Sequence, residues 1–311
     1  MKAGEKMKHN SEFIQDFMSR YEYPEEAVKL FTEVFDRLDN EKFFGKRFDK
    51  LVDKFAFHHS RIEPKILNHL CILAFLMGYK YYTLYFAFVL CLTEDLKRQY
   101  MLFGIDEKYY WGTMNDLKCK LLECMECRGV PGTFSAPWLD GFFHLDRIAY
   151  GRFEYEVSTY GRDEPFKMKN GRVVKKGDTY IGFHIPSSGI PLTDEVRYAS
   201  YREAYEHVKG LFPDGKVLFG CGSWLLYPRH REFLPEHMNI RKFMDDFELV
   251  ESSESDDFHD IWRIFGKDAK LPYDKLPRDT TLKKAYAEWL CKEGKAGSGF
   301  GLFLFDGEKI I

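Results

Sequence analysis

The chain has 311 residues, of which 45% are hydrophobic and 31% are charged, as is typical of a soluble globular protein large enough for two domains. Its formal net charge of −3 lacks the basic excess that general nucleic-acid-binding proteins carry. The N-terminal segment is charged and polar and does not resemble a signal peptide, and the seven cysteines make an odd number. We therefore expect reduced thiols, a cytoplasmic protein, and no nucleic-acid or membrane partner.

Residues 1–135 are predicted to form an all-α N-terminal domain. Pro24 opens a helix with two acidic residues in its first turn, and apolar residues follow at helical spacing. Residues 66–77 and 81–92 are apolar almost all round, which is typical of helices at the centre of a domain.

Residues 70–92 are also long enough to span a membrane, so two interpretations compete for this stretch. Lys80 stands in its middle, and a lysine at the centre of a bilayer costs roughly 3 kcal/mol on insertion. The pattern therefore favours two buried helices that meet near Gly78.

The pattern changes after a break at residues 129–133. Apolar and polar side chains alternate over residues 153–159, as in a half-buried strand, and the Asn-Gly pair at 170–171 is a hairpin signal. We place the domain boundary at the break. The predicted fold class is α+β, with a helical domain over residues 1–135 and a mixed-sheet α/β domain over residues 136–311.

A strand–helix–strand unit lies at the centre of the second domain. The first strand, 179–185, ends in a polar loop, and Thr193 is the predicted N-cap of the following helix. A short strand at 216–219 leads into a loop of small residues. If these strands are parallel, their loops lie side by side at the carboxyl edge of the sheet, where open α/β sheets bind ligands. The predicted site therefore comprises His184, Ser187, Ser188 and Gly189 from the first loop and Cys221, Gly222, Ser223 and Trp224 from the second.

The C-terminal segments are predicted as a hairpin, a helix and a closing strand. Residues 247–250 and 261–265 are the two strands of the hairpin, around an acidic turn. Residues 281–293 carry an apolar helical face. The sequence KAGSGFG, residues 295–301, is predicted as a glycine-rich loop and a second candidate phosphate cradle, although it lacks the order of a P-loop.

Two side chains of the predicted site suit chemistry on an acyl group. His184 is either a general base for an amine, since histidine titrates near neutrality, or a packed histidine bonded to backbone. Cys221 is either a nucleophile that takes the acyl group with His184 as its base, or a small buried apolar residue.

The remaining candidates also have structural alternatives. Ser223 is a donor to an acyl carbonyl or a helix cap, and Trp224 is the wall of an acyl channel or part of the core. One of two strand glutamates, Glu154 and Glu156, is a possible base in a cleft, or both lie on a solvated strand face. Arg278 grips a phosphate or forms a structural ion pair.

Three cysteines follow the spacing C-x4-C-x2-C at Cys119, Cys124 and Cys127. A zinc site needs four ligands, and His144 is the nearest candidate for the fourth. Because the cysteines fall partly on one helix face, we interpret them as buried thiols and expect no metal.

Several short motifs recur in an order known from one acyltransferase family. They are YGRFEYE at 150–156, His184-Ile185-Pro186 with Gly189, Cys221 with SWLL at 223–226, Asn239-Ile240, Leu276-Pro277-Arg278, and Ser298-Gly299. In these motifs the chain resembles bacterial two-domain proteins with a helical N-acyltransferase N-terminal domain and a GNAT-like C-terminal domain. The resemblance covers most of residues 138–306, while the helical half is similar only in character.

This resemblance implies an N-acyltransferase that moves an acyl group from acyl-coenzyme A to an amine acceptor. For this reaction the candidate catalytic residues are those that the site chemistry singled out, His184, Cys221 and Ser223. The candidate residues for binding acyl-coenzyme A are Ile185, Ser187, Ser188, Gly189, Trp224, Asn239 and Arg278.

The loop before the central helix departs from the family pattern. It reads SSGIPLTDE, whereas GNAT enzymes have Arg/Gln-x-x-Gly-x-Gly/Ala, whose backbone N–H groups hold the pyrophosphate. Asp194 and Glu195 in the first helical turn would repel a phosphate there. Two alternatives therefore stay open beside acyl transfer to an amine: a catalytically silent GNAT-like binding module, and an enzyme that forms an acyl-thioester on Cys221.

Overall fold

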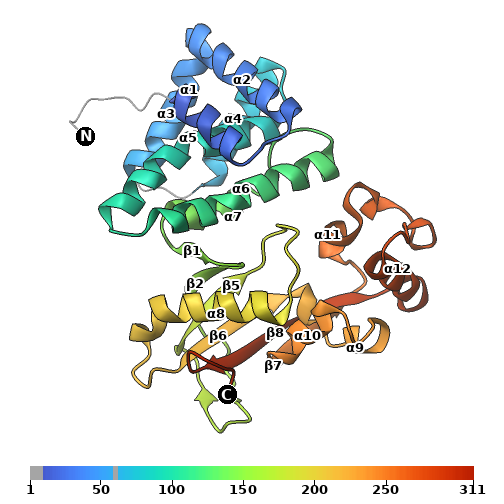
Figure 1. The fold of residues 1–311 in the computed structure, drawn as a ribbon. Coiled ribbons are helices and arrows are strands. Elements are labelled where there is room, and N and C mark those ends of the chain that lie inside the picture. The colour runs from blue at the N-terminus through green and yellow to red at the C-terminus, as the bar shows by residue number, and fades with distance from the viewer. Residues whose placement is uncertain (1–9, 59–61) are drawn as a thin grey trace. The chain divides into compact units, whose positions relative to one another are not determined.

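The computed structural model describes residues 10–58 and 62–311, and the chain divides into two compact units, Met1–Ile148 and Ala149–Ile311. The first unit is helical, as predicted (Figure 1). Its helices are α1 (Ser11–Arg20), α2 (Glu25–Asn40), α3 (Lys42–His58), α4 (Pro64–Met77), α5 (Tyr81–Leu102), α6 (Glu107–Arg128) and α7 (Ala136–Phe143).

Helix α5 is the centre of the first unit. It contacts α1, α2, α3, α4, α6 and α7, and most of its side chains are buried. The preceding helix, α4, ends at Gly78, whose φ of 75° is left-handed and costs glycine little. The prediction of two helices that meet near Gly78 is therefore confirmed, but only α5 is central, since Ile72, Phe75 and Leu76 of α4 are 59%, 82% and 52% exposed.

No single helix within residues 10–58 and 62–311 has the length and apolar composition needed to cross a membrane. Helices α4 and α5 pass that test only together, as a pair bent by 118°.

The boundary between the units follows α7, whereas the sequence pattern placed it before this helix, after residue 135. Helix α7 packs on α5, and the backbone N–H of Ile62 donates to Asp140 of α7 at 2.7 Å. The rings of Phe55 and Phe143 also meet edge to face, 6.2 Å apart. The break at residues 129–133 is thus a turn inside the first unit.

The second unit is built on a mixed six-stranded sheet in the order β1-β2-β5-β6-β8-β7. Strand β5 is antiparallel to β2 and parallel to β6, and β8 is antiparallel to both of its neighbours. The strands are β1 (Arg147–Tyr150), β2 (Phe153–Thr159), β5 (Thr179–His184), β6 (Val217–Ser223), β7 (Glu248–Ser255) and β8 (Ala296–Phe305). A separate hairpin joins β3 (Phe166–Lys167) and β4 (Val173–Val174) around the predicted Asn-Gly turn.

The helices of the second unit are α8 (Asp194–Val208), α9 (His230–Phe233), α10 (Asn239–Asp245), α11 (Trp262–Phe265) and α12 (Thr281–Glu293). Helix α8 crosses one face of the sheet (Figure 1). It begins as predicted, since the Thr193 side chain accepts a hydrogen bond from the Val196 N–H at 3.4 Å.

One face of the sheet is aromatic. Phe153, Phe183, Phe219 and Phe303 project from four neighbouring strands and surround Tyr201 of α8, with ring centroids 4.8–6.0 Å from the Tyr201 ring. We call this the aromatic face. The residues that alternate with these phenylalanines lie on the other side, which we call the His184 face.

The acidic segment after α10 was predicted wrongly as the turn of a hairpin. Residues 248–255 form the edge strand β7, paired with the start of β8, and residues 262–265 form the short helix α11. Acidic side chains such as Glu251 and Glu254 do not exclude an edge strand, because charges on an exposed edge prevent further pairing.

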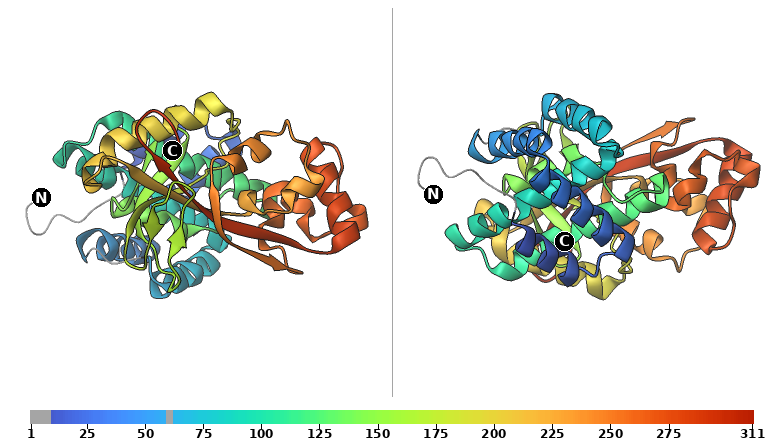
Figure 2. Two further views of the ribbon diagram at one scale, coloured as in Figure 1. Left: turned by 90° about the horizontal axis from the view of Figure 1, so that it is seen from below. Right: turned by 90° about the horizontal axis from the view of Figure 1, so that it is seen from above.

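The glycine-rich segment 295–301 was also predicted wrongly, since most of it belongs to β8, which reaches out to α12 (Figure 2). A Cβ on Gly297 would lie 2.0 Å from the Ser253 carbonyl oxygen, and one on Gly299 would lie 2.4 Å from the Leu226 carbonyl oxygen. These glycines allow neighbouring backbone to approach the strand, so they do not mark a phosphate loop.

Candidate functional site

The site begins where strands β5 and β6 stop pairing. Their parallel ladder contains Ile181 with Phe219 and Gly182 with Gly220. Beyond these two pairs, β5 continues to pair with β2 as far as His184, and β6 continues to pair with β8 as far as Ser223. Each strand therefore follows a different partner, and the two strands separate at their carboxyl ends, a place that we call the opening.

His184 ends β5 at this opening and contacts a carboxylate. Its Nε2 lies 3.0 Å from Oε1 of Glu156, and each side chain has an exposed fraction of 27%. Glu156 pairs with Gly182 and Glu154 pairs with His184, so both glutamates lie on the His184 face. The sequence offered Glu154 and Glu156 as alternatives, and the structure brings Glu156 into contact with the histidine.

Cys221 lies on the opposite side of the sheet from His184. Gly182 of β5 lies opposite Gly220 of β6, and both residues face the same side of the sheet. His184 is two residues after Gly182 and faces that side, whereas Cys221 is one residue after Gly220 and faces the other. Cys221 is in strand β6 rather than in the predicted loop, and its side chain is 3% exposed. Burial raises the pKa of its thiol to about 12, which disfavours the nucleophilic thiolate. The predicted pairing of Cys221 with His184 as its base is therefore wrong.

We expect Cys221→Ala to keep kcat within about threefold of the parent, because the side chain is buried on the face of the sheet opposite His184. Alkylation of the native protein by iodoacetamide should occur first at exposed Cys291 and leave Cys221 unmodified, as peptide mass mapping would reveal. A loss of activity that follows alkylation of Cys221, with protection by an acyl donor, would restore the acyl-thioester hypothesis.

Ser223 and Trp224 take the structural roles that the sequence left open. Ser223 Oγ accepts a hydrogen bond from the Leu225 N–H at 3.1 Å and caps a 3₁₀ turn, Trp224–Leu226. Trp224 is half-buried and lies edge-on to His230 and Tyr286, at centroid distances of 6.0 and 5.9 Å. Their catalytic and acyl-donor-binding roles stay predictions.

The loop after β5 provides the other candidate contacts for an acyl donor. Ile185 and Ser188 are half-buried, while Ser187 and Gly189 are exposed. Gly189 has a φ of 76°, a backbone conformation that favours glycine. Arg152, in the turn between β1 and β2, donates through its Nε to the Ile190 carbonyl oxygen at 3.1 Å, so this turn holds the loop.

A buried ion pair fixes the end of this loop. Arg197 of α8 is 2% exposed, donates to the Leu192 carbonyl oxygen, and forms a bidentate pair with Asp246 at 2.7 and 3.1 Å. The Tyr201 hydroxyl also donates to Asp246, at 2.9 Å. Sequence reasoning missed this pair, although an arginine one turn before Tyr201 on a buried helix face was the available signal.

Arg278 and Asn239 are not brought to the histidine by any contact in residues 62–311. Arg278 is exposed and donates to the carbonyl oxygens of Asp274 and Leu276, which fixes the turn before α12. Among the described residues no ion pair of Arg278 is found, and its third hydrogen bond goes to Cys291 Sγ at 3.8 Å. Asn239 is the half-buried first residue of α10. Their predicted roles in binding the acyl donor remain predictions.

The seven cysteines all lie within the described part of the chain and are free thiols. Cys119 and Cys124 are buried and Cys127 is half-buried. Across residues 10–58 and 62–311, no group of three or more His, Cys, Asp or Glu side chains is arranged to hold a metal ion.

Family models match both units of the chain. Residues 12–145 match the N-acyltransferase N-terminal domain, and residues 148–303, half of the chain, match the GNAT-like C-terminal domain. This protein belongs to the acyltransferase family that joins these two domains. The resemblance inferred from the sequence motifs is thus confirmed, and so are the acyltransferase class and the α+β fold.

Solved structures of acyltransferases have the same fold. An acyltransferase in complex with decanoyl-CoA and teicoplanin is 18% identical, with a TM-score of 0.73, covering 98% of this chain and 91% of that chain. An acyltransferase bound to decanoyl-CoA is 20% identical, with a TM-score of 0.72 and coverages of 94% and 88%. A mutant acyltransferase bound to octanoyl-CoA is 18% identical, with a TM-score of 0.70 and the same coverages. A search of curated proteins gave no match.

Proposed function

We propose that this acyltransferase moves an acyl group from acyl-coenzyme A to an amine on a small-molecule acceptor, with His184 as general base. The observation that carries the proposal is the His184–Glu156 contact at the opening between β5 and β6. Related structures hold octanoyl-CoA, decanoyl-CoA and teicoplanin, which supports an acyl donor of this kind and a small-molecule acceptor.

The opening suits a thioester because β5 and β6 no longer pair with each other there. Backbone groups that face such an opening are available to the extended arm and carbonyl oxygen of an acyl donor. The amine nitrogen attacks the thioester carbonyl carbon, a C–N bond forms, and His184 takes the proton that the amine loses. The C–S bond then breaks, and coenzyme A leaves as the thiol after it receives that proton.

Glu156 acts through His184 in this scheme. Its carboxylate lies beside the imidazole on the same face of the sheet, where it orients the ring and stabilises the imidazolium that forms during transfer. The pair requires β2 and β5 to stay in register, which their six-residue ladder provides.

The acyl-donor step can be tested by thermal unfolding with acetyl-, octanoyl- and decanoyl-coenzyme A. A ligand at a hundred times its Kd stabilises the native state by about 2.7 kcal/mol, so we expect a rise in Tm of several degrees with at least one donor. Coenzyme A without an acyl group serves as the reference. If none of the donors changes the Tm, the protein is a catalytically silent binding module instead. The acidic residues in the first turn of α8, which would repel a phosphate, favour that alternative.

A further inference from the structure

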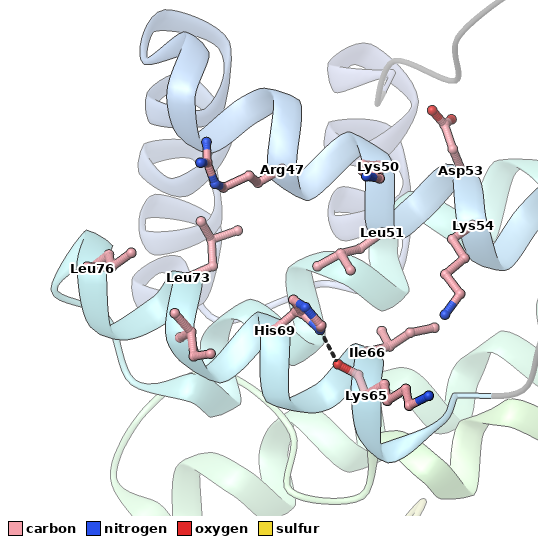
Figure 3. Close-up of a pocket in the computed structure, with 11 residues that line it drawn as sticks. Arg47, Lys50, Leu51, Asp53, Lys54, Lys65, Ile66, His69, Leu73 and Leu76 are labelled. Atoms are coloured by element: carbon pink, nitrogen blue, oxygen red, sulfur yellow. Dashed lines mark hydrogen bonds between the residues drawn. The ribbon is translucent and has the colours of Figure 1, made fainter.

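The first unit contains a cavity between α3 and α4, shown in Figure 3. Its volume of about 590 Å³ falls within the roughly 300–1,000 Å³ of ligand-binding pockets. Neither the sequence motifs nor the proposed acyl-transfer site uses these two helices. The side chains that line it decide which ligand chemistry it would recognise.

The walls of the cavity are aliphatic. Leu51 of α3 and Ile66, Leu73 and Leu76 of α4 line it (Figure 3). Leu73 belongs to the core, whereas Leu76 is 52% exposed at the edge of the cavity. His69 of α4 also lines the cavity, with its Nδ1 2.6 Å from the Lys65 carbonyl oxygen, so an alkyl chain there would meet one imidazole beside the aliphatic walls.

The edge of the cavity is cationic. Arg47, Lys50 and Lys54 follow one another at spacings of three and four residues, so they share a face of α3. Lys65 joins them from the first turn of α4, and Asp53 is the carboxylate among the lining residues. Four cationic side chains against one anionic side chain give the edge a net positive charge.

We propose that this cavity binds the anion of a free fatty acid, with its chain between the aliphatic walls and its carboxylate at the cationic edge. The concave shape favours a single chain over a lipid bilayer, which would need a convex apolar surface. The positive charge favours a carboxylate over a cationic or neutral headgroup of the same chain length.

Calorimetric titration of the full chain with sodium decanoate, kept below its micelle concentration, tests the headgroup. We expect one site on α3 and α4, at which decyltrimethylammonium binds at least tenfold more weakly. The double variant Lys50→Gln/Lys65→Gln should weaken decanoate binding about tenfold. Asp53→Asn should strengthen it two- to fivefold, a gain that loss of fold cannot mimic. Lys46→Gln removes the same charge from α3 outside the cavity and should change binding less than twofold.

A fatty acid that carries a diazirine on its chain tests the location. Peptide mapping after irradiation should find the label in residues 42–77, and excess decanoate should remove it. Equal binding of the two headgroups, an equal effect of Lys46→Gln and of the double variant Lys50→Gln/Lys65→Gln, or label confined to residues 149–311 would overturn the proposal. So would binding to anionic vesicles that depends on Phe75 of α4, which is 82% exposed, without binding of monomeric decanoate.

Discussion

His184→Ala is expected to lower kcat for acyl transfer by about 10²- to 10⁴-fold, the usual contribution of a general base. The imidazole accepts the proton of the attacking amine in the proposed mechanism, and alanine has no group that replaces it. The KM for the acyl donor should change much less, because binding of the donor does not depend on this proton transfer. Steady-state release of coenzyme A thiol measures both quantities.

Two further variants separate catalysis from folding. Glu156→Gln keeps the shape of the side chain and removes the charge that faces His184, so kcat should fall up to tenfold, consistent with about 1 kcal/mol for a partly exposed ion pair. His237→Ala removes an exposed histidine of the same unit and should leave kcat within twofold. If His184→Ala retains the parent kcat while its Tm is unchanged, His184 is not the base.

Asp246→Ala is expected to destabilise the second unit by about 3–5 kcal/mol, because it leaves the Arg197 guanidinium buried without its carboxylate partner. It also removes the acceptor of the Tyr201 hydroxyl at the centre of the aromatic face. Urea unfolding followed by amide hydrogen exchange in α8 reports this unit separately from the helical one.

The neighbouring aspartate gives a matched control. Asp245 pairs with Arg231 on the surface, with exposed fractions of 62% and 47%, so Asp245→Ala should cost less than about 1 kcal/mol. Arg197→Met combined with Asp246→Leu should recover part of the lost stability, since apolar residues of similar size can replace a buried ion pair. Equal losses in the two aspartate variants would show that the buried pair does not hold α8 in place.

The sequence patterns correctly predicted the features that depend only on residues close together in the chain. The Thr193 cap, the helix over 281–293 and the break at Gly78 each depend on residues a few positions apart, and all three are present. The wrong predictions concern segments whose structure depends on pairing with a strand far away in the sequence. Residues 248–255 became a strand because β8 lies beside them, and Gly297 and Gly299 became strand residues because backbone from elsewhere packs against them.

The candidate site shows the same division. The sequence alone determined that His184 ends a strand and precedes a polar loop, and that the motifs around it belong to an acyltransferase family. The tertiary structure decided which strand each residue pairs with, and therefore which face of the sheet each side chain occupies. Register placed Glu156 beside His184 and Cys221 on the opposite face, because side chains alternate along paired strands and a shift of one residue exchanges the two faces.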